Sequence, residues 1–358
     1  MPSAPPLPPP ASPDAPPSDP AGSLLSLPPP QLPGDELIRL ARLHWGVEGQ
    51  LVPLTSERDQ NHRLDGPAGS FVLKLSNPAE PAAMTEFQTA ALIHAAAADP
   101  GLPVPPVYPA RDGRVVVATP AGALRLLGWC PGTPLARLPR SEPLARATGD
   151  AAARLTRALS DFRHPADDHV LLWDLRQFPR LQPLAPALPP ALAAELAEAQ
   201  QRFAAQIAPV LGALPTQVVH ADFNPHNLLA DPEAPTRLTA VLDFGDMVRT
   251  PRICDLAVAA SYLVEPDAPL RLVAPLVAAY HARLPLQPQE IRLLPLLIEC
   301  RMLTTLTIAT WRAGRYPGNA DYILRNAPSA RAGLQALRAA DPGALVAPLL
   351  AACERPAP

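Results

Sequence analysis

The chain has 358 residues, 48% of them hydrophobic, and a formal net charge of −3 at pH 7. This length accommodates one large domain or two smaller ones with a sizeable core. The small net charge and the 4% aromatic content argue against a nucleic-acid-binding protein and against a polybasic protein of membrane surfaces. The four cysteines lie far apart in sequence, so neither a disulfide scaffold nor a zinc ribbon is indicated, and we expect a reducing, cytoplasmic environment. No apolar run approaches the length of a membrane span.

The first 34 residues are rich in proline and contain 14 of the 52 prolines of the chain. Proline fixes φ and lacks an N–H, so this segment is unsuited to a regular helix or sheet. We therefore predict a disordered or polyproline II tail over residues 1–34.

From residue 35 the pattern of apolar residues predicts a β-rich unit that ends near residue 129. Helices are expected at 35–44 and 81–98, and strands at 46–54, 61–64, 71–75, 104–108, 114–118 and 123–129. Strands in this order, with one helix among them, predict an antiparallel sheet of the α+β class.

A short segment rich in proline and glycine, residues 130–134, separates this unit from a second one, residues 135–358. In the second unit we predict helices at 142–159, 190–207, 253–263, 270–283 and 289–312, and short strands at 217–220, 228–229 and 239–242. The proline-rich residues 178–190 are expected to form a surface connection. The sequence thus predicts a small β-rich lobe, a hinge and a larger, mainly helical lobe.

Two polar clusters, each bounded by apolar residues, carry the chemistry. The first is His220-Ala221-Asp222 with Asn227 five residues after the aspartate, and the second begins at Asp243. Phosphoryl transfer needs an aspartate that accepts a hydroxyl proton, and an asparagine and a second aspartate that hold Mg²⁺. Asp222, Asn227 and Asp243 fit these roles in this order. The alternative is that they are ordinary loop-capping and turn residues.

Lys74 is the only lysine among 30 lysine and arginine residues, and it lies in an apolar, strand-like stretch. Lysine is a compact point charge, whereas arginine is planar and forked, so a site that grips nucleotide phosphates explains why lysine is used here. Its carboxylate partner is expected on the following helix. We predict Glu86 for this role, with Glu80 as the competitor.

The remaining nucleotide contacts are expected at the edges of the small lobe. Ser56, in the turn between the first two strands, is predicted to contact phosphate although this turn lacks a glycine-rich motif, and Arg58 beside it is either a phosphate contact or a solvated charge. Backbone groups near Trp129 and Cys130 are predicted to bind the base, because a proline- and glycine-rich hinge leaves backbone groups free.

Together, His220-x-Asp222-x4-Asn227, Asp243-Phe244-Gly245-Asp246 and Asp255-Leu256-Ala257 resemble the aminoglycoside phosphotransferase and small-molecule kinase superfamily. The resemblance covers about residues 36–330. It implies a two-lobed, protein-kinase-like fold, with Asp222 as catalytic base, Asn227 and Asp243 as Mg²⁺ ligands and Asp255 as a structural residue. The superfamily commonly has glycine where this chain has Ala221. Three stretches, 53–61, 171–175 and 243–246, are similar to the hydroxylysine kinase branch.

These features predict an enzyme that transfers the γ-phosphate of ATP or GTP to the hydroxyl of a small amine-containing metabolite, with 5-hydroxylysine as the best candidate. Asp246 is expected to contact an acceptor amine. Arg301 either binds an acceptor carboxylate or pairs with Glu299 or another core carboxylate.

Other functions remain open at this point. Aminoglycosides, homoserine, choline and ethanolamine are alternative acceptors. A non-catalytic nucleotide-binding module is a second class of function. A metal-dependent hydrolase that uses His220, Asp222 and His226 as ligands is a third.

Overall fold

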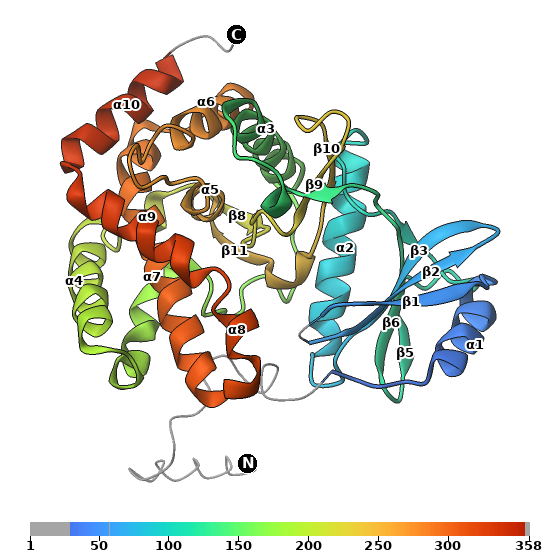
Figure 1. Ribbon diagram of the computed structural model, residues 1–358. Helices are drawn as coiled ribbons and strands as arrows, with labels where there is room; N and C mark the ends of the chain where they lie inside the picture. Colours follow the sequence, from blue (N-terminus) through green and yellow to red (C-terminus); the bar gives the residue numbers. More distant parts are fainter. Residues whose placement is uncertain (1–28, 57, 355–358) are drawn as a thin grey trace, which may run out of the picture.

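The structure is a computed structural model that describes residues 29–56 and 58–354. It has two lobes, and the predicted bilobal α+β architecture is confirmed (Figure 1). The small lobe contains α1 (Gly34–Trp45), β1 (Gln50–Leu54), β2 (Gln60–Gly66), β3 (Gly69–Leu75), α2 (Ala82–Ala98), β4 (Val107–Tyr108), β5 (Val117–Thr119) and β6 (Gly122–Gly128). The strands form one antiparallel sheet in the order β1-β2-β3-β6-β4, with β5 also paired to β6.

The two faces of this sheet differ in polarity. Phe71, Leu73 and Leu75 alternate along β3 and pack with α1 in a small apolar core. Lys74 lies between them in the sequence and therefore points to the opposite face. Its neighbours in register are Asn61 on β2 and Arg125 on β6, so three polar side chains form a row across that face. Helix α2 belongs to the core of the large lobe as well, so it lies between the sheet and the rest of the protein (Figure 1).

The chain crosses between the lobes at residues 129–132. Strand β6 ends at Gly128, and β7 (Thr133–Pro134) already pairs with a strand of the large lobe. The predicted hinge was residues 130–134. The crossing thus begins one residue before that range and ends two residues before its end.

The large lobe is mainly helical, as predicted. Its regular elements are α3 (Glu142–Ala158), α4 (Pro190–Gln206), β8 (Thr216–Val219), β9 (Leu228–Ala230), β10 (Leu238–Val241), β11 (Val248–Pro251), α5 (Arg252–Ser261), α6 (Val273–Arg283), α7 (Pro288–Arg315), α8 (Ala320–Ile323), α9 (Ala327–Ala339) and α10 (Pro342–Glu354). Strand β11 and helices α8 to α10 were not foreseen from the sequence. Helix α7 has the length and composition of a membrane span, as α9 and α10 have together, but the most apolar window of α7 is 89% buried inside the protein, as in a core helix.

The segment expected to be a surface connection is instead a long 3₁₀ helix, Leu175–Ala187, packed into the core. Its buried residues recur every third position, at Leu175, Phe178, Leu181 and Leu184. A 3₁₀ helix has three residues per turn, so these side chains share one face. The three prolines within the segment obscured this period-three pattern in the sequence.

Of the predicted proline-rich tail, residues 1–28 lie outside the described residues. The described end of the tail is attached to the sheet, because the side chain of Gln60 accepts from the Leu32 N–H (2.7 Å) and donates to the Leu32 carbonyl (2.9 Å). The prediction of a tail over residues 1–34 is therefore wrong at its C-terminal end, where Leu32 is bound to Gln60 and α1 begins at Gly34.

We predict that Leu181→Ala lowers the free energy of unfolding by about 2–5 kcal/mol, because the Leu181 side chain is fully buried and its removal leaves a cavity. The control is Leu43→Ala on α1, where the side chain is 55% exposed and a change within about 0.5 kcal/mol is expected. Urea denaturation followed by circular dichroism measures both. Equal effects of the two substitutions would contradict the packing of the 3₁₀ segment.

Candidate active site

Two loops of the large lobe meet because their ends are paired with each other. One loop connects β8 to β9 and contains Asp222, and the other connects β10 to β11 and contains Asp243. The last residue of β8 pairs with the first of β11 (Val219 with Val248), and the first residue of β9 pairs with the last of β10 (Leu228 with Val241). The backbone alone therefore brings the two predicted catalytic clusters together.

His220 ties the two loops at their base. Its Nδ1 accepts from the Asp222 N–H (3.2 Å), so the ring is protonated at Nε2, which donates to the Leu242 carbonyl (2.9 Å). The ring is fully buried and packs edge-on against Phe223 and Phe244. His220 is therefore an anchor of the two loops, and both of its nitrogens are occupied.

Ala221 adopts the left-handed conformation, with φ of 62°. This conformation costs a residue with a β-carbon about 1–2 kcal/mol, which explains why glycine is common at this position in the superfamily. The Ala221 N–H donates to the buried carboxylate of Asp255 on α5 (2.8 Å). Asp255 thus holds the catalytic loop in its strained form, the structural role that the resemblance implies.

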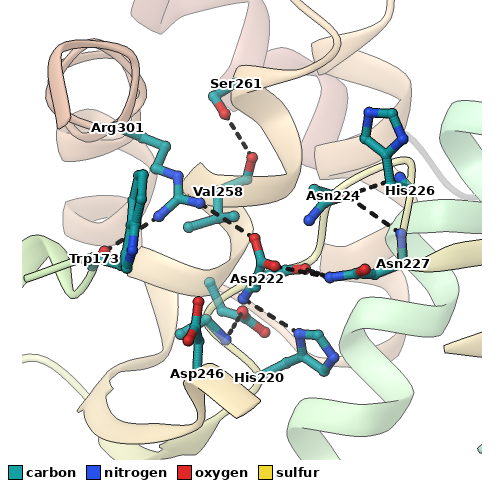
Figure 2. Close-up of polar contacts among 12 residues, drawn as sticks. Trp173, His220, Asp222, Asn224, His226, Asn227, Asp246, Val258, Ser261 and Arg301 are labelled. Carbon is teal, nitrogen blue, oxygen red and sulfur yellow. Dashed lines mark hydrogen bonds and ion pairs between the residues drawn. The ribbon is translucent and has the colours of Figure 1, made fainter. Parts of the chain in front are cut away.

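Asp222 and Asn227 lie side by side at the tip of their loop (Figure 2). The Nδ2 group of Asn227 donates to the Oδ2 atom of Asp222 (2.8 Å) and to its carbonyl (3.1 Å). The side-chain oxygen of Asn227 is consequently left for a cation. Asn224 shapes the turn between them by accepting from the His226 N–H (2.8 Å) and the Asn227 N–H (3.3 Å).

The second loop contributes two carboxylates. Asp243 has φ of 59° and caps the short 3₁₀ turn Phe244–Asp246. Its carboxylate is solvent accessible, so it is available to a cation. Asp246 forms an ion pair with Arg58 of the β1–β2 turn (3.2 Å), and this contact links the two lobes.

Neighbouring charges shift the pKa values of Asp222 and Asp243 in opposite directions. Burial, reinforced by Asp246 and Asp243, raises the pKa of Asp222 to about 7, and Arg301 opposes this rise. The surrounding protein partly desolvates the Asp243 carboxylate, which still reaches solvent, and this would raise its pKa, but Lys74 and Arg58 outweigh the effect and hold the pKa below its usual value. The charge of Lys74 therefore stabilises the ionised carboxylate of Asp243, which places this lysine where a phosphate-binding lysine is expected.

The prediction that Glu86 is the partner of Lys74 is wrong. Lys74 Nζ pairs with Asp59 of the β1–β2 turn (2.9 Å), whereas Glu86 is exposed on α2. The buried face of α2 contains Thr85, Gln88 and Thr89, so Glu86 lies off that face. The competitor, Glu80, is not the partner either.

Glu80 instead accepts hydrogen bonds from Thr85 (2.7 Å) and Gln88 (3.0 Å), near the start of α2. Gln88 and Thr89 in turn contact Arg125, which is 2% exposed and lies beside Lys74 in register. Sequence reasoning missed both Asp59 and Arg125. The sequence signal for Asp59 was its place in the turn that faces the phosphates, and the signal for Arg125 was a charge within an apolar strand.

The other residues predicted to contact the nucleotide lie in the β1–β2 turn and in the crossing between the lobes. The hydroxyl of Ser56 accepts from the Asp59 N–H (3.2 Å) and so shapes the β1–β2 turn. The Trp129 N–H donates to the Ser70 carbonyl (3.2 Å), and its indole stacks with Arg63. Among the described residues, the backbone N–H of Cys130 has no backbone partner, so it is free for a nucleotide base. These roles remain predictions.

Arg301 is not placed to bind an acceptor carboxylate. It lies on the buried face of α7, is 3% exposed and contacts the Oδ1 atom of Asp222 through Nη2 (3.4 Å). Glu299 is not its partner either, because Glu299 pairs with Arg202 and with Arg338. The carboxylate that Arg301 meets is that of the predicted base.

The metal-hydrolase interpretation is not supported by the geometry. Both nitrogens of His220 are used within the protein, and the ring of His226 points away from Asp222 (Figure 2). Within residues 29–56 and 58–354, no group of three or more histidine, cysteine, aspartate or glutamate side chains is arranged to hold a metal ion.

Comparison with known proteins agrees with this geometry. Residues 50–294 match the model of a family described as the phosphotransferase enzyme family. The chain belongs to the phosphotransferase enzyme family. Hydroxylysine kinase of Danio rerio is 28% identical over 318 residues, which cover 82% of this chain and 88% of the relative. Hydroxylysine kinase of Bos taurus is 28% identical over 317 residues, 80% of this chain and 84% of the relative.

Solved structures of other phosphotransferases share the fold. A microcompartment-associated aminopropanol kinase has a TM-score of 0.68 at 22% identity and covers 90% of this chain and 99% of its own. Amicoumacin kinase, solved with AMP-PNP and Ca²⁺, has a TM-score of 0.61 at 14% identity and covers 83% of this chain and 93% of its own. The phosphotransferase is thus a small-molecule kinase with a protein-kinase-like fold.

We predict that Lys74→Ala weakens the binding of AMP-PNP by about 10- to 100-fold, since a hydrogen bond to a charged group contributes about 1.5–3 kcal/mol. Glu86→Gln is the control, and it should bind AMP-PNP as the wild type does because Glu86 is exposed and lies off the buried face of α2. Isothermal titration calorimetry measures both. If Glu86→Gln lost as much affinity as Lys74→Ala, the assignment of Asp59 as the partner of Lys74 would be wrong.

Proposed function

We propose that this phosphotransferase transfers the γ-phosphate of ATP or GTP to the hydroxyl group of 5-hydroxylysine. The proposal is supported by similarity over at least 80% of the chain to relatives named hydroxylysine kinase. The observation that carries it is a second carboxylate, that of Asp246, which lies near Asp222 where the two loops meet (Figure 2). 5-Hydroxylysine has an ammonium group on the carbon next to the hydroxyl-bearing carbon, so its acceptor end needs a base with a second carboxylate nearby.

The residues present fit a divalent cation with oxygen ligands. The free side-chain oxygen of Asn227 and the accessible carboxylate of Asp243 are the donors that Mg²⁺ prefers. Bound there with the nucleotide, Mg²⁺ would neutralise charge on the transferring phosphate.

The chain's own groups account for the remaining steps. Lys74 leaves its ion pair with Asp59 and binds the phosphates. Backbone groups near Trp129 and Cys130 hold the nucleotide base. Asp222 orients the acceptor hydroxyl and takes its proton as the new O–P bond forms and the bond to the departing nucleoside diphosphate breaks. Positioning and electrostatics supply most of the rate.

Asp246 is proposed to bind the ε-ammonium group of the acceptor. Its carboxylate forms an ion pair with Arg58 in the structure. The phosphates compete for Arg58, and their binding therefore frees Asp246 for the acceptor.

We predict that an assay of nucleoside diphosphate release gives the highest kcat/KM with 5-hydroxylysine. The panel also contains homoserine, choline, ethanolamine, an aminoglycoside and 1-amino-2-propanol, which carries the same vicinal amino alcohol without the amino-acid end. Release is measured with ATP and with GTP. Turnover of aminoglycosides alone would contradict the proposed acceptor.

Asp222→Asn separates catalysis from binding in the same assay. Phosphoryl transfer should fall by about 10²–10⁴-fold because the proton acceptor is lost. Binding of AMP-PNP by calorimetry should be retained, since Lys74 and Asp243 are intact. Near-normal turnover of this variant would refute Asp222 as the base.

A further inference from the structure

Arg301 is a charged residue in an unusual place. It lies in the middle of α7, where 19 of the 28 residues are buried. Burying a guanidinium group is costly unless its hydrogen bonds are made within the protein. Here the Nε atom of Arg301 has no hydrogen-bond partner in the described part of the chain. Arg252, a buried arginine of the same lobe, does use its Nε atom, in one of its two hydrogen bonds to Glu290.

Arg301 contacts the base directly, and it also lies against Trp173 and close to the hydroxyl of Tyr262. Nη2 meets the Oδ1 atom of Asp222 (3.4 Å), and Nη1 donates to the carbonyl of Trp173 (3.2 Å). The guanidinium carbon also lies 5.1 Å from the centre of the Trp173 ring. The backbone and the ring of one residue thus fix the guanidinium from two directions (Figure 2).

The carboxylate of Asp222 is in this way held from two sides. Asn227 donates to Oδ2 and Arg301 contacts Oδ1, so these two contacts restrict rotation of the carboxylate group. Each carboxylate oxygen accepts more than one hydrogen bond, so lone pairs remain for the acceptor hydroxyl. The base is therefore oriented before the substrates arrive.

We propose that Arg301 is a positioning residue of the phosphoryl transfer, which fixes the plane of the Asp222 carboxylate from the core while Trp173 fixes Arg301. The proposal gives a role to the stretch Leu171–Leu175, which the catalytic residues leave unexplained. It concerns the phosphotransferase reaction itself and holds for whichever alcohol is the acceptor.

The test is Arg301→Lys, which keeps the charge but loses the forked contact with Trp173 and Asp222. With the best acceptor of the panel, kcat should fall by about 10²-fold, as expected when a catalytic group is displaced. The KM values and the affinity for AMP-PNP should stay within about threefold of the wild type. A kcat within threefold of the wild type would overturn the proposal, and so would a loss confined to the KM of the acceptor, which would make Arg301 an acceptor ligand.

Arg252→Lys is the matched control, because Arg252 is a buried arginine of the same lobe whose forked contact is with Glu290. It should lower the melting temperature about as much as Arg301→Lys does, but leave kcat per folded molecule within about threefold of the wild type. An equal loss of kcat in the two variants would show that destabilisation alone explains the effect.

Two further variants keep the test decisive if Arg301→Lys folds poorly. Trp173→Leu removes the ring under the guanidinium and should lower kcat by about tenfold with KM unchanged. Adding Arg301→Lys to Asp222→Asn should cause no further loss of kcat, because a residue that acts only through the base has nothing left to position. Additive losses in this cycle, or an unchanged kcat in Trp173→Leu, would contradict the proposal.

Discussion

The active site depends on the mutual pairing of its two loops. Strand β8 pairs with β11, and β9 pairs with β10. The loop that contains Asp222 therefore begins beside the end of the loop that contains Asp243, and ends beside its beginning. His220 closes the remaining gap by accepting from one loop and donating to the other. Catalysis by positioning needs side chains that do not move, and here the backbone supplies that rigidity before any ligand binds.

Charge balance is the second constraint on the site. The carboxylates of Asp243 and Asp246 lie close enough to Asp222 to raise its pKa. Like charges at such short range are unfavourable unless cations offset them. Lys74, Arg58 and Arg301 supply these cations, from the sheet, the turn above the cleft and the core of the large lobe, respectively. With Asp59, the partner of Lys74, included, four carboxylates face three cations, and a cation that enters with the nucleotide can offset the remaining negative charge.

Much of the fold and part of the site could be predicted from the sequence, and the reasons differ from residue to residue. The spacing of Asp222 and Asn227 encodes one tight loop, and the rarity of lysine drew attention to Lys74. The partner of Lys74 was missed because it depends on which face of α2 turns inward and on a turn, around Asp59, whose conformation no periodic pattern describes. Arg301 was recognised as unusual, but its partner lies 79 residues away and could be found only in three dimensions. The 3₁₀ helix Leu175–Ala187 was missed because its prolines suggested a connection while its leucines followed a period of three.

The central claim is that these residues form one site that brings a nucleotide phosphate to an alcohol. A crystal structure of the Asp222→Asn variant with AMP-PNP, Mg²⁺ and 5-hydroxylysine tests it most directly. We expect the γ-phosphate between Lys74 and Asp243, with the acceptor hydroxyl beside residue 222 and pointing at that phosphate. A nucleotide bound outside the cleft, or an acceptor whose hydroxyl lies away from residue 222, would contradict the account.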